Sequence, residues 1–355
     1  MAPSLPPLPI AIVGAGMAGL SCAFSLAQAG HSVHVFDKSR GPSGRMSTRR
    51  GDGENIAGKP VEAWQCDHGA PSFSAHDADF RAQVDIWEQA GVAGRWQARI
   101  GRHDGENFSR EQEAAKQLVG IPRMTAPARH MVHSMEQLAM PVHLRWQTTV
   151  ESLKRQDDGS WVVNNGQQLL ELPRYQAVLL AIPAPQAAPL VAEIDPDAAT
   201  LARQVHMHPC WAVMVRCLEK LPLPIDGCLV EQGPLRWIAR DSSKPGRTGS
   251  ETWLLHACPQ WSQAHIEDDP QTVANTLVQT FAQLSGADLS GAQASAHRWR
   301  YANTISPLKI GSWWNSVLGL GMCGDWLQDG TVEGAWLSGR DLAQQIEKAL
   351  RSASS

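Results

Sequence analysis

An α/β fold with a parallel sheet is predicted by two features at the start of the sequence. An apolar run over residues 10–13 is followed by a glycine-rich turn and by helix-forming residues that end at Gly30, where a C-cap is expected. A second strand is then expected over residues 31–37, where Val33, Val35 and Phe36 are apolar. The order strand, turn, helix, strand is one βαβ unit, which is typical of open parallel sheets.

The composition fits a globular protein with a sizeable core. Its 355 residues are 43% hydrophobic and 19% charged, enough for one large domain or two interlocked ones. A formal net charge of -4 gives no basic field for nucleic acid or anionic lipid. Prolines interrupt both the first nine residues and the long apolar stretch 177–192, which argues against a signal peptide and a membrane span. We therefore expect a cytoplasmic protein without nucleic-acid or membrane partners.

Neither the cysteines nor the histidines form a metal-binding pattern. The seven cysteines are scattered and contain no CxxC pair, which favours reduced thiols over a disulfide framework or a zinc site. His206 and His208 alternate as strand ligands would, but no third ligand is evident. We expect no metal.

The remaining pattern indicates a chain whose two ends belong to one domain. Further strands are expected at residues 142–144, 161–163, 177–182, 211–217, 253–257 and 317–322, and helices at 79–90, 129–139, 270–283 and 333–350. We interpret residues 1–75, 140–190 and 290–355 as a discontinuous cofactor-binding domain. Residues 76–139 and 191–289 would then form a second, mixed α+β substrate domain.

The turn after the first strand predicts a Rossmann-type dinucleotide site. Gly14 permits the tight turn, Gly16 allows a pyrophosphate to approach the backbone, and Gly19 lets helix and strand pack closely. The pyrophosphate would lie at a helix N-terminus, where free N–H groups favour negative charge. Asp37 ends the second strand and is placed to accept hydrogen bonds from ribose hydroxyls.

The same glycine spacing recurs at residues 319–324. No amphipathic helix follows directly, because Asp325, Asp329 and Gly330 intervene. We interpret this second copy as a glycine-flanked strand.

Two further regions favour FAD over NAD as the dinucleotide. The loop 38–50 contains five cations and no acid, and within it Arg45 is placed to pair with FAD phosphates or with an anionic substrate. Near the other end, Asp325 can bond a ribityl or pyrophosphate-side hydroxyl, and a helix starting near Val332 can face the flavin N1/C2=O edge. Gly334, Ser338 and Gly339 are expected to keep one helix face small enough for a flat ring.

With these features in place, the chain resembles the renalase family in its bacterial form, within the wider flavin amine-oxidase-like group. The resembling segments are IAIVGAGMAGL, VFDKSRGPSGRMSTRR, DHGA, AIPAPQA, SKPGR, HRWRYA and CGDWLQDGTVEGAWLSG. They are spread from residue 10 to residue 340, so the likeness covers nearly the whole chain. Each segment alone is common, but the joint pattern is specific.

The resemblance implies a fold, an activity and a set of contacts. The fold is an FAD-binding domain plus a mixed substrate domain, as in amine oxidases and p-hydroxybenzoate hydroxylase. The activity is oxidation of 2- and 6-dihydro isomers of NAD(P) to NAD(P)+, with oxygen reoxidising noncovalent FAD to give hydrogen peroxide. Beside the three glycines and Lys38, the implied FAD contacts are Met17, Asp37, Arg45, Ala70, Pro71, Val150, Asp325 and Val332. The implied substrate contacts are Ser72, Phe73, Ser74, Ala75, His76, Trp211 and Thr331.

The chain departs from the family pattern at two places. The double glycine before the arginine reads Ser43-Gly44, and the polar-aromatic pair after Gly69-Ala70 reads Pro71-Ser72, with an aromatic only at Phe73. The first change is expected to be harmless, whereas the second puts the substrate contacts in doubt. His68 is left open as a structural loop residue or a flavin-edge contact. Cys323 precedes a Gly-Asp turn, so we expect no covalent flavin link.

Three functions remain open at this point. In a dihydropyridine, the lone pair of the ring nitrogen already drives hydride loss. Oxidation of the ring therefore needs positioning more than a base, and we assign no catalytic residue. A flavin amine oxidase is the second hypothesis. Amine sites often place two tyrosines beside the flavin, and this chain has only Tyr175 and Tyr301. A flavin-loaded binding protein without turnover is the third hypothesis.

Overall fold

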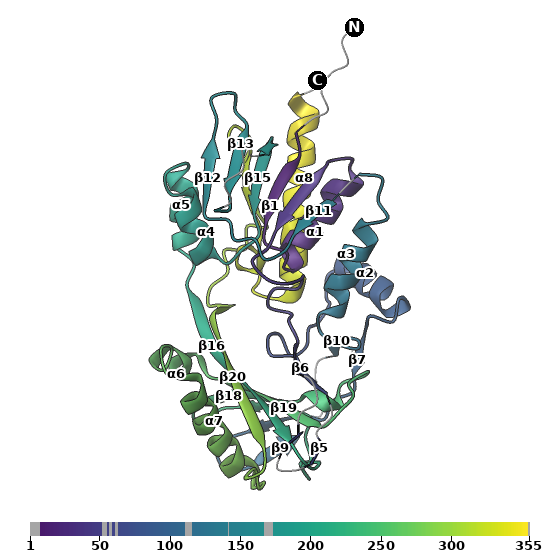
Figure 1. Cartoon of the computed structure of the whole chain (residues 1–355), viewed down its shortest axis with the longest axis vertical. Helices are drawn as coiled ribbons and strands as arrows, with labels where there is room; N and C mark the ends of the chain where they lie inside the picture. Colours follow the sequence, from purple (N-terminus) through teal and green to yellow (C-terminus); the bar gives the residue numbers. More distant parts are fainter. Residues whose placement is uncertain are drawn as a thin grey trace. The chain divides into compact units, whose positions relative to one another are not determined.

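The computed structural model describes residues 8–51, 55–56, 59–60, 63–110, 116–140, 142–166 and 173–353. The chain divides into two compact units (Figure 1). Unit 1 comprises Met1–Gly44, Ala128–Met207 and Thr304–Ser355, and unit 2 comprises Arg45–Pro127 and His208–Asn303.

Unit 1 is built on a six-stranded sheet. Its order is β11 (Val142–Arg145), β2 (Val33–Phe36), β1 (Ile10–Val13), β15 (Ala177–Leu180), β22 (Leu320–Met322) and β21 (Trp313–Asn315). The first five strands are parallel, and β21 is antiparallel to β22. Since β15 pairs with both β1 and β22, the two ends of the chain meet in one sheet, as the sequence predicts.

Two helices pack closely against each other in unit 1. They are α1 (Met17–Gln28) and α8 (Val332–Ala353), and Figure 1 shows them side by side. The Ser21 hydroxyl donates to the Trp336 carbonyl oxygen at 2.8 Å. A Cβ on Gly339 would collide with the Ala18 carbonyl oxygen, so a glycine is required at this crossing.

The rest of unit 1 forms a second small sheet and three helices. The sheet contains β12 (Ser152–Arg155), β13 (Trp161–Asn164) and β14 (Arg174–Tyr175), and the helices are α3 (Ala126–Met135), α4 (Ala184–Val191) and α5 (Pro196–Arg203). Trp161, Tyr175 and Trp326 are buried in the shared core. A short 3-10 turn, η2 (Asp325–Leu327), joins β22 to α8.

Unit 2 is built on a seven-stranded mixed sheet. Its order is β20 (Gln293–Thr304), β16 (Met207–Cys217), β19 (Glu251–Ala257), β18 (Leu235–Arg240), β17 (Gly227–Val230), β8 (Ile100–His103) and β9 (Phe108–Arg110). Helix α7 (Pro270–Ser285) buries Val273, Leu277 and Phe281 in the same core as Trp253 of the sheet. The Asp269 carboxylate caps α7 by accepting the backbone N–H groups of Gln271 and Thr272.

Smaller elements complete unit 2. They are β3 (Arg49–Gly51), β4 (Asn55–Ile56), β5 (Lys59–Pro60), β6 (Trp64–Cys66), α2 (Ala78–Gln89), β7 (Ala93–Trp96), β10 (Gln117–Gly120), the 3-10 turn η1 (Asp241–Ser243) and α6 (Pro259–Ala264). Strand β6 pairs with β3, and β10 pairs with β7. The α/β class with a second, mixed unit is therefore confirmed.

Each strand and helix expected from the sequence is present, with shifted ends. The second glycine repeat is a strand, β22, as predicted. Helices α4 and α5 were not expected, because the prolines of residues 183–196 obscured them. The packing places residues 45–75 in unit 2, whereas we expected them in the cofactor-binding domain. The limits of the ligand-binding domains themselves stay a prediction.

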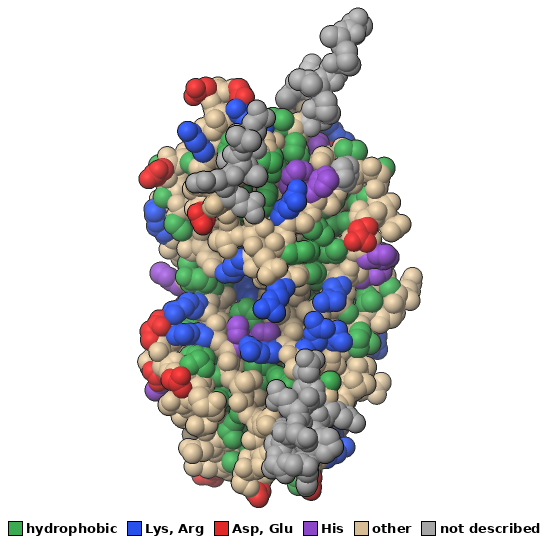
Figure 2. Space-filling view, in the orientation of Figure 1, with side chains coloured by type: hydrophobic (Ala, Val, Ile, Leu, Met, Phe, Trp, Pro, Cys, Tyr) green, Lys and Arg blue, Asp and Glu red, His purple; other side chains and the backbone are tan. Residues whose placement is uncertain are grey.

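The surface and the thiols agree with the composition. Acidic and basic side chains are interspersed with hydrophobic and uncharged ones on the face in Figure 2. All seven cysteines are free thiols, and six of them are buried. Among the described residues, none of the helices combines the length and the hydropathy needed to cross a membrane.

Candidate flavin site

The glycine turn after β1 assigns a different role to each glycine. Gly14 has a φ of +107°, and a Cβ there would collide with the Ala181 carbonyl oxygen. A Cβ on Gly19 would collide with the Gly14 carbonyl oxygen. Around Gly16, in contrast, nothing lies within 4 Å of an added Cβ among the described residues. Gly14 and Gly19 therefore serve packing, whereas Gly16 leaves the backbone open to a ligand.

The N-terminus of α1 is suited to a pyrophosphate. Gly16 is its N-cap and supplies no side chain to the first amide N–H groups, and the first turn carries no acid. Unpaired N–H groups at a helix N-terminus favour an anion through hydrogen bonds and the helix dipole. The residues present at this turn, Met17 included, thus fit the pyrophosphate of FAD.

Asp37 lies at the end of β2, beside this turn. Its Oδ2 accepts the Ala15 N–H at 2.6 Å, and its Oδ1 accepts the Ser39 N–H at 2.7 Å. Each carboxylate oxygen can accept a further hydrogen bond, so these contacts leave capacity for ribose hydroxyls. The neighbouring Lys38 is exposed. Ribose binding by Asp37 stays a prediction.

The C-terminal residues expected at the flavin lie in the same unit. Asp325 comes three residues after the end of β22, is 4% exposed and opens the turn that leads to α8. The Thr331 hydroxyl accepts the Gly334 N–H at 2.9 Å, so Thr331 acts as a helix cap. Val332 is the first residue of α8. Thr331 therefore has a structural role in α8. Its expected contact with substrate stays a prediction.

The structure gives a packing reason for the small face of α8 and shows where Val150 lies. A Cβ on Gly334 would collide with the Asp329 carboxylate. The Ser338 hydroxyl accepts the Gly324 N–H and donates to the Gly311 carbonyl oxygen. Together with the Gly339 crossing, this packing explains the small face of α8 without a flavin ring. Val150 is 9% exposed and packs in the core, and its contact with adenine, which the resemblance assigns to backbone groups, stays a prediction.

The loop before Arg45 is strained. Ser43 is buried and has a φ of +118°, a region that favours glycine, while its N–H donates to the Ala15 carbonyl oxygen at 3.0 Å. A Cβ on Gly44 would lie 3.2 Å from the Gly16 Cα. Serine in place of the family's first glycine was expected to be harmless. That expectation stays a prediction, and the structure adds that a non-glycine residue at this φ costs free energy.

Arg45 and the loop around Ala70 are held together in unit 2. The Arg45 carbonyl oxygen accepts the Ala70 N–H at 2.8 Å, and a Cβ on Gly69 would collide with the same oxygen. The Arg45 guanidinium donates to the Ala302 carbonyl oxygen at 3.0 Å. Pro71 follows this loop and is half-buried. Contact of Arg45, Ala70 and Pro71 with FAD stays a prediction.

Two of the expected substrate contacts are buried side chains. Phe73 is 5% exposed and packs against Phe80 and Trp87, because its backbone bridges to Leu118 and turns the ring into the core. Trp211 is fully buried. Its indole N–H donates to the His265 carbonyl oxygen at 2.9 Å. Contact of Phe73 and Trp211 with substrate stays a prediction.

The other residues of this stretch are accessible. Ser72 is half-buried and donates to the Gln117 side-chain oxygen. Ser74 and Ala75 are half-buried, and His76 is exposed. Their contact with substrate stays a prediction.

Sequence reasoning missed a buried charge quartet in unit 2, formed by Asp67, Asp241, Lys244 and Arg247. The Lys244 ammonium lies 2.9 Å from Asp67 Oδ2 and 2.6 Å from Asp241 Oδ1, and all three side chains are fully buried. Arg247 also pairs with Asp67. Burial favours a raised pKa for Asp67, but Lys244 and Arg247 hold it below its usual range. The two acids are thus neutralised by two bases.

A second missed feature is the histidine cluster, defined here as His68, His256, His297 and Trp299. The His68 ring stacks on Trp299 with centroids 5.2 Å apart, and it meets the His297 ring edge-to-face at 4.7 Å. The Trp299 indole N–H donates to the His68 carbonyl oxygen at 2.9 Å. The sequence contains a signal for this cluster, because DHGA and HRWRYA are both segments that resemble the family. The sequence does not show that these two segments lie close together.

The histidine cluster is uncharged at neutral pH. Burial, then the charges of His297, Arg49 and His256, lower the pKa of His68 to about 3. Burial lowers the pKa of His256 to about 4, and burial and Arg49 also lower the pKa of His297. The cluster therefore presents aromatic surface and neutral hydrogen-bonding groups.

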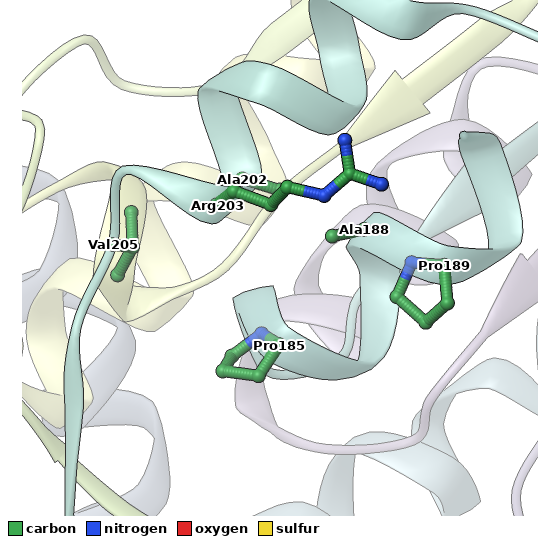
Figure 3. Close-up of a pocket in the computed structure, with 6 residues that line it drawn as sticks. All are labelled: Pro185, Ala188, Pro189, Ala202, Arg203 and Val205. Carbon is green, nitrogen blue, oxygen red and sulfur yellow. The ribbon is translucent and has the colours of Figure 1, made fainter.

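A separate groove in unit 1 has no part in these features (Figure 3). Its volume is about 410 Å³, and it lies at α4 and α5 with Arg203 extended beside otherwise apolar side chains. Its lining residues are Pro185, Ala188, Pro189, Ala202, Arg203 and Val205. None of them was expected to bind cofactor or substrate.

The fold and the glycine turn define a dinucleotide-binding protein with a Rossmann-type unit. A model for Rossmann-like NAD(P)-binding domains matches residues 12–90. The model of flavin containing amine oxidoreductases matches residues 105–347, more than half of the chain. The chain therefore belongs to the flavin containing amine oxidoreductase family, and its cofactor is noncovalent FAD.

Similar proteins agree with this assignment at two levels. A 48-residue stretch is 52% identical to an L-amino-acid oxidase of Bothrops pauloensis, and a 44-residue stretch is 57% identical to one of Daboia russelii. These stretches are 14% and 12% of this chain, and they span only 10% and 9% of those relatives.

Solved structures share the fold over nearly the whole chain. Cyclohexylamine oxidase from Brevibacterium oxydans has a TM-score of 0.69 at 12% identity, with 98% of this chain and 100% of that chain covered. An oxidoreductase from Methanosarcina mazei has a TM-score of 0.65 at 11% identity, with 95% and 100% covered. At such low identity these structures establish the fold alone.

Proposed function

We propose that this protein oxidises 2- and 6-dihydro isomers of NAD(P) to NAD(P)+ and passes the electrons to oxygen. The substrate loses a hydride, and oxygen takes up the two electrons with two protons to become hydrogen peroxide. Bound FAD supplies the hydride acceptor. The residues of the chain would orient the substrate and keep water away, because the dihydropyridine nitrogen itself drives hydride loss.

The observation that supports this proposal is the aromatic surface of the histidine cluster, where the His68 ring stacks on Trp299 and meets the His297 ring edge-to-face. Its three imidazoles are uncharged at neutral pH, and the nearby Asp67 is already paired with Lys244 and Arg247. Such a surface suits a flat, uncharged dihydropyridine ring. A substrate ammonium would instead favour an unpaired carboxylate.

An amine oxidase is the second candidate, because the family and the similar cyclohexylamine oxidase favour it. A two-tyrosine cage is not available here. Tyr175 is 2% exposed, its hydroxyl lies 3.1 Å from His34 Nδ1, and its ring contacts Phe36. Of the two tyrosines in the chain, only Tyr301 remains for a binding role. A flavin-loaded binding protein without turnover is the third candidate.

Anaerobic flavin reduction distinguishes the three candidates. The purified FAD-loaded protein is mixed separately with 6-dihydroNAD, 2-dihydroNAD, ordinary NADH, cyclohexylamine and putrescine, and loss of absorbance near ~450 nm is followed. We expect fast reduction by the two isomers and formation of NAD+. Reduction that is no faster than with NADH refutes the proposal. Reduction by an amine favours an amine oxidase, and no reduction by any compound favours a binding protein.

A further inference from the structure

One nitrogen of the His68 ring is buried without a partner. His68 is 7% exposed. Its Nδ1 atom is buried and has no hydrogen-bond partner among the described residues. A buried polar atom without a partner costs free energy, so native proteins keep such atoms rarely. A group that arrives with a ligand would satisfy this nitrogen.

The surrounding residues fix the orientation of the ring. Trp299 stacks on the imidazole and also holds the His68 backbone through its indole N–H, at 2.9 Å from the carbonyl oxygen. His256 Nε2 lies 3.4 Å from the same oxygen. The preceding Asp67 is anchored by the buried charge quartet. The ring is therefore a rigid group rather than a mobile loop side chain.

The protonation state of the ring limits what it can bind. At neutral pH the imidazole is uncharged, because burial lowers the pKa of His68 to about 3. A neutral imidazole has one N–H donor and one acceptor nitrogen. A carboxamide matches either tautomer, because it has both an oxygen acceptor and N–H donors.

We propose that His68 is a specificity-determining residue whose Nδ1 hydrogen-bonds the carboxamide of a dihydropyridine substrate, beside the aromatic surface of His297 and Trp299. This inference rests on the proposed function. It assigns His68 a role in binding, without a role in proton transfer.

Three substitutions of His68 test the inference in the full-length, FAD-loaded protein. His68→Asn keeps polar atoms near the position of Nδ1, His68→Gln moves them to the position of Nε2, and His68→Leu removes them. His265→Leu is the matched control, because His265 belongs to the same unit and its half-buried side chain pairs with Asp268.

The measurement is the rate of anaerobic flavin reduction at increasing 6-dihydroNAD, which yields a Kd and a limiting rate. We expect the Kd to rise about tenfold in His68→Leu and His68→Gln, and to stay within about threefold of wild type in His68→Asn. The limiting rate and the flavin content should change little in all three. The control should equal wild type.

Other outcomes overturn the inference. A wild-type Kd in His68→Leu, or equal weakening in His68→Asn and His68→Leu, shows that Nδ1 does not contact the carboxamide. Should His68→Leu fail to fold, the comparison of His68→Asn with His68→Gln decides in the same way. If 6-dihydroNAD does not reduce the wild-type flavin, the proposed function fails and the inference falls with it.

Discussion

Replacing Lys244 with methionine should strongly destabilise unit 2. The Lys244 ammonium lies 2.9 Å from Asp67 and 2.6 Å from Asp241, and these side chains are 0% exposed. Methionine leaves two buried carboxylates facing one guanidinium, that of Arg247. Removing one partner of a buried ion pair costs about 3–5 kcal/mol, because the other charge remains without compensation. We expect the free energy of unfolding to fall by about that amount.

Urea unfolding of the FAD-loaded protein, followed by tryptophan fluorescence, measures this loss. Arg102→Met is the control in the same unit, since the Arg102–Glu231 pair is 49% and 42% exposed. Such a surface pair contributes about 0–1 kcal/mol. Adding Asp241→Asn to Lys244→Met should restore part of the stability, because it rebalances the charges. A loss no larger than that of the control would refute the reasoning.

Three further predictions concern the glycine turn, the loop beside it and the histidine cluster. Gly16→Ser should weaken FAD binding by about tenfold or more in a fluorescence titration while leaving the apoprotein stable, whereas Gly19→Ser should lower its stability. Equal effects of the two substitutions on stability would contradict this distinction. Ser43→Gly should raise the free energy of unfolding by about 1 kcal/mol, since relief of strain exceeds the entropy of the added glycine; a destabilised variant would exclude strain at φ +118°. Because the folded pKa of His68 is about 3, the unfolded chain binds more protons below its own pKa near ~6.5. As the pH decreases from about 6.5 toward about 3, this group should lower the free energy of unfolding by up to about 1.4 kcal/mol per pH unit. Urea titrations at decreasing pH should show a shallower decline in His68→Leu than in wild type.

Features encoded by neighbouring residues could be predicted from the sequence. The strand, glycine turn, helix and acid of residues 10–37 lie in one continuous stretch, and their geometry follows from local backbone rules. The joining of both chain ends in one sheet was also predictable, because each end carries a glycine-flanked strand before a helix.

Features that depend on burial were decided by the tertiary structure. Phe73 and Trp211 matched a substrate pattern, but the packing of unit 2 makes both part of its core. The strain at Ser43 depends on a φ value that the residue type does not reveal. Local patterns cannot fix these properties, because burial and backbone angles follow from contacts with distant segments.

The sequence by itself thus determined the class of fold, the dinucleotide turn and the flavin cofactor. Only the tertiary structure brought His68 to His297 and Trp299, and Asp67 to Lys244 and Arg247. These partners are separated by well over a hundred residues in the chain. Their charges and pKa values follow from shared burial, which exists only after the sheet of unit 2 has assembled.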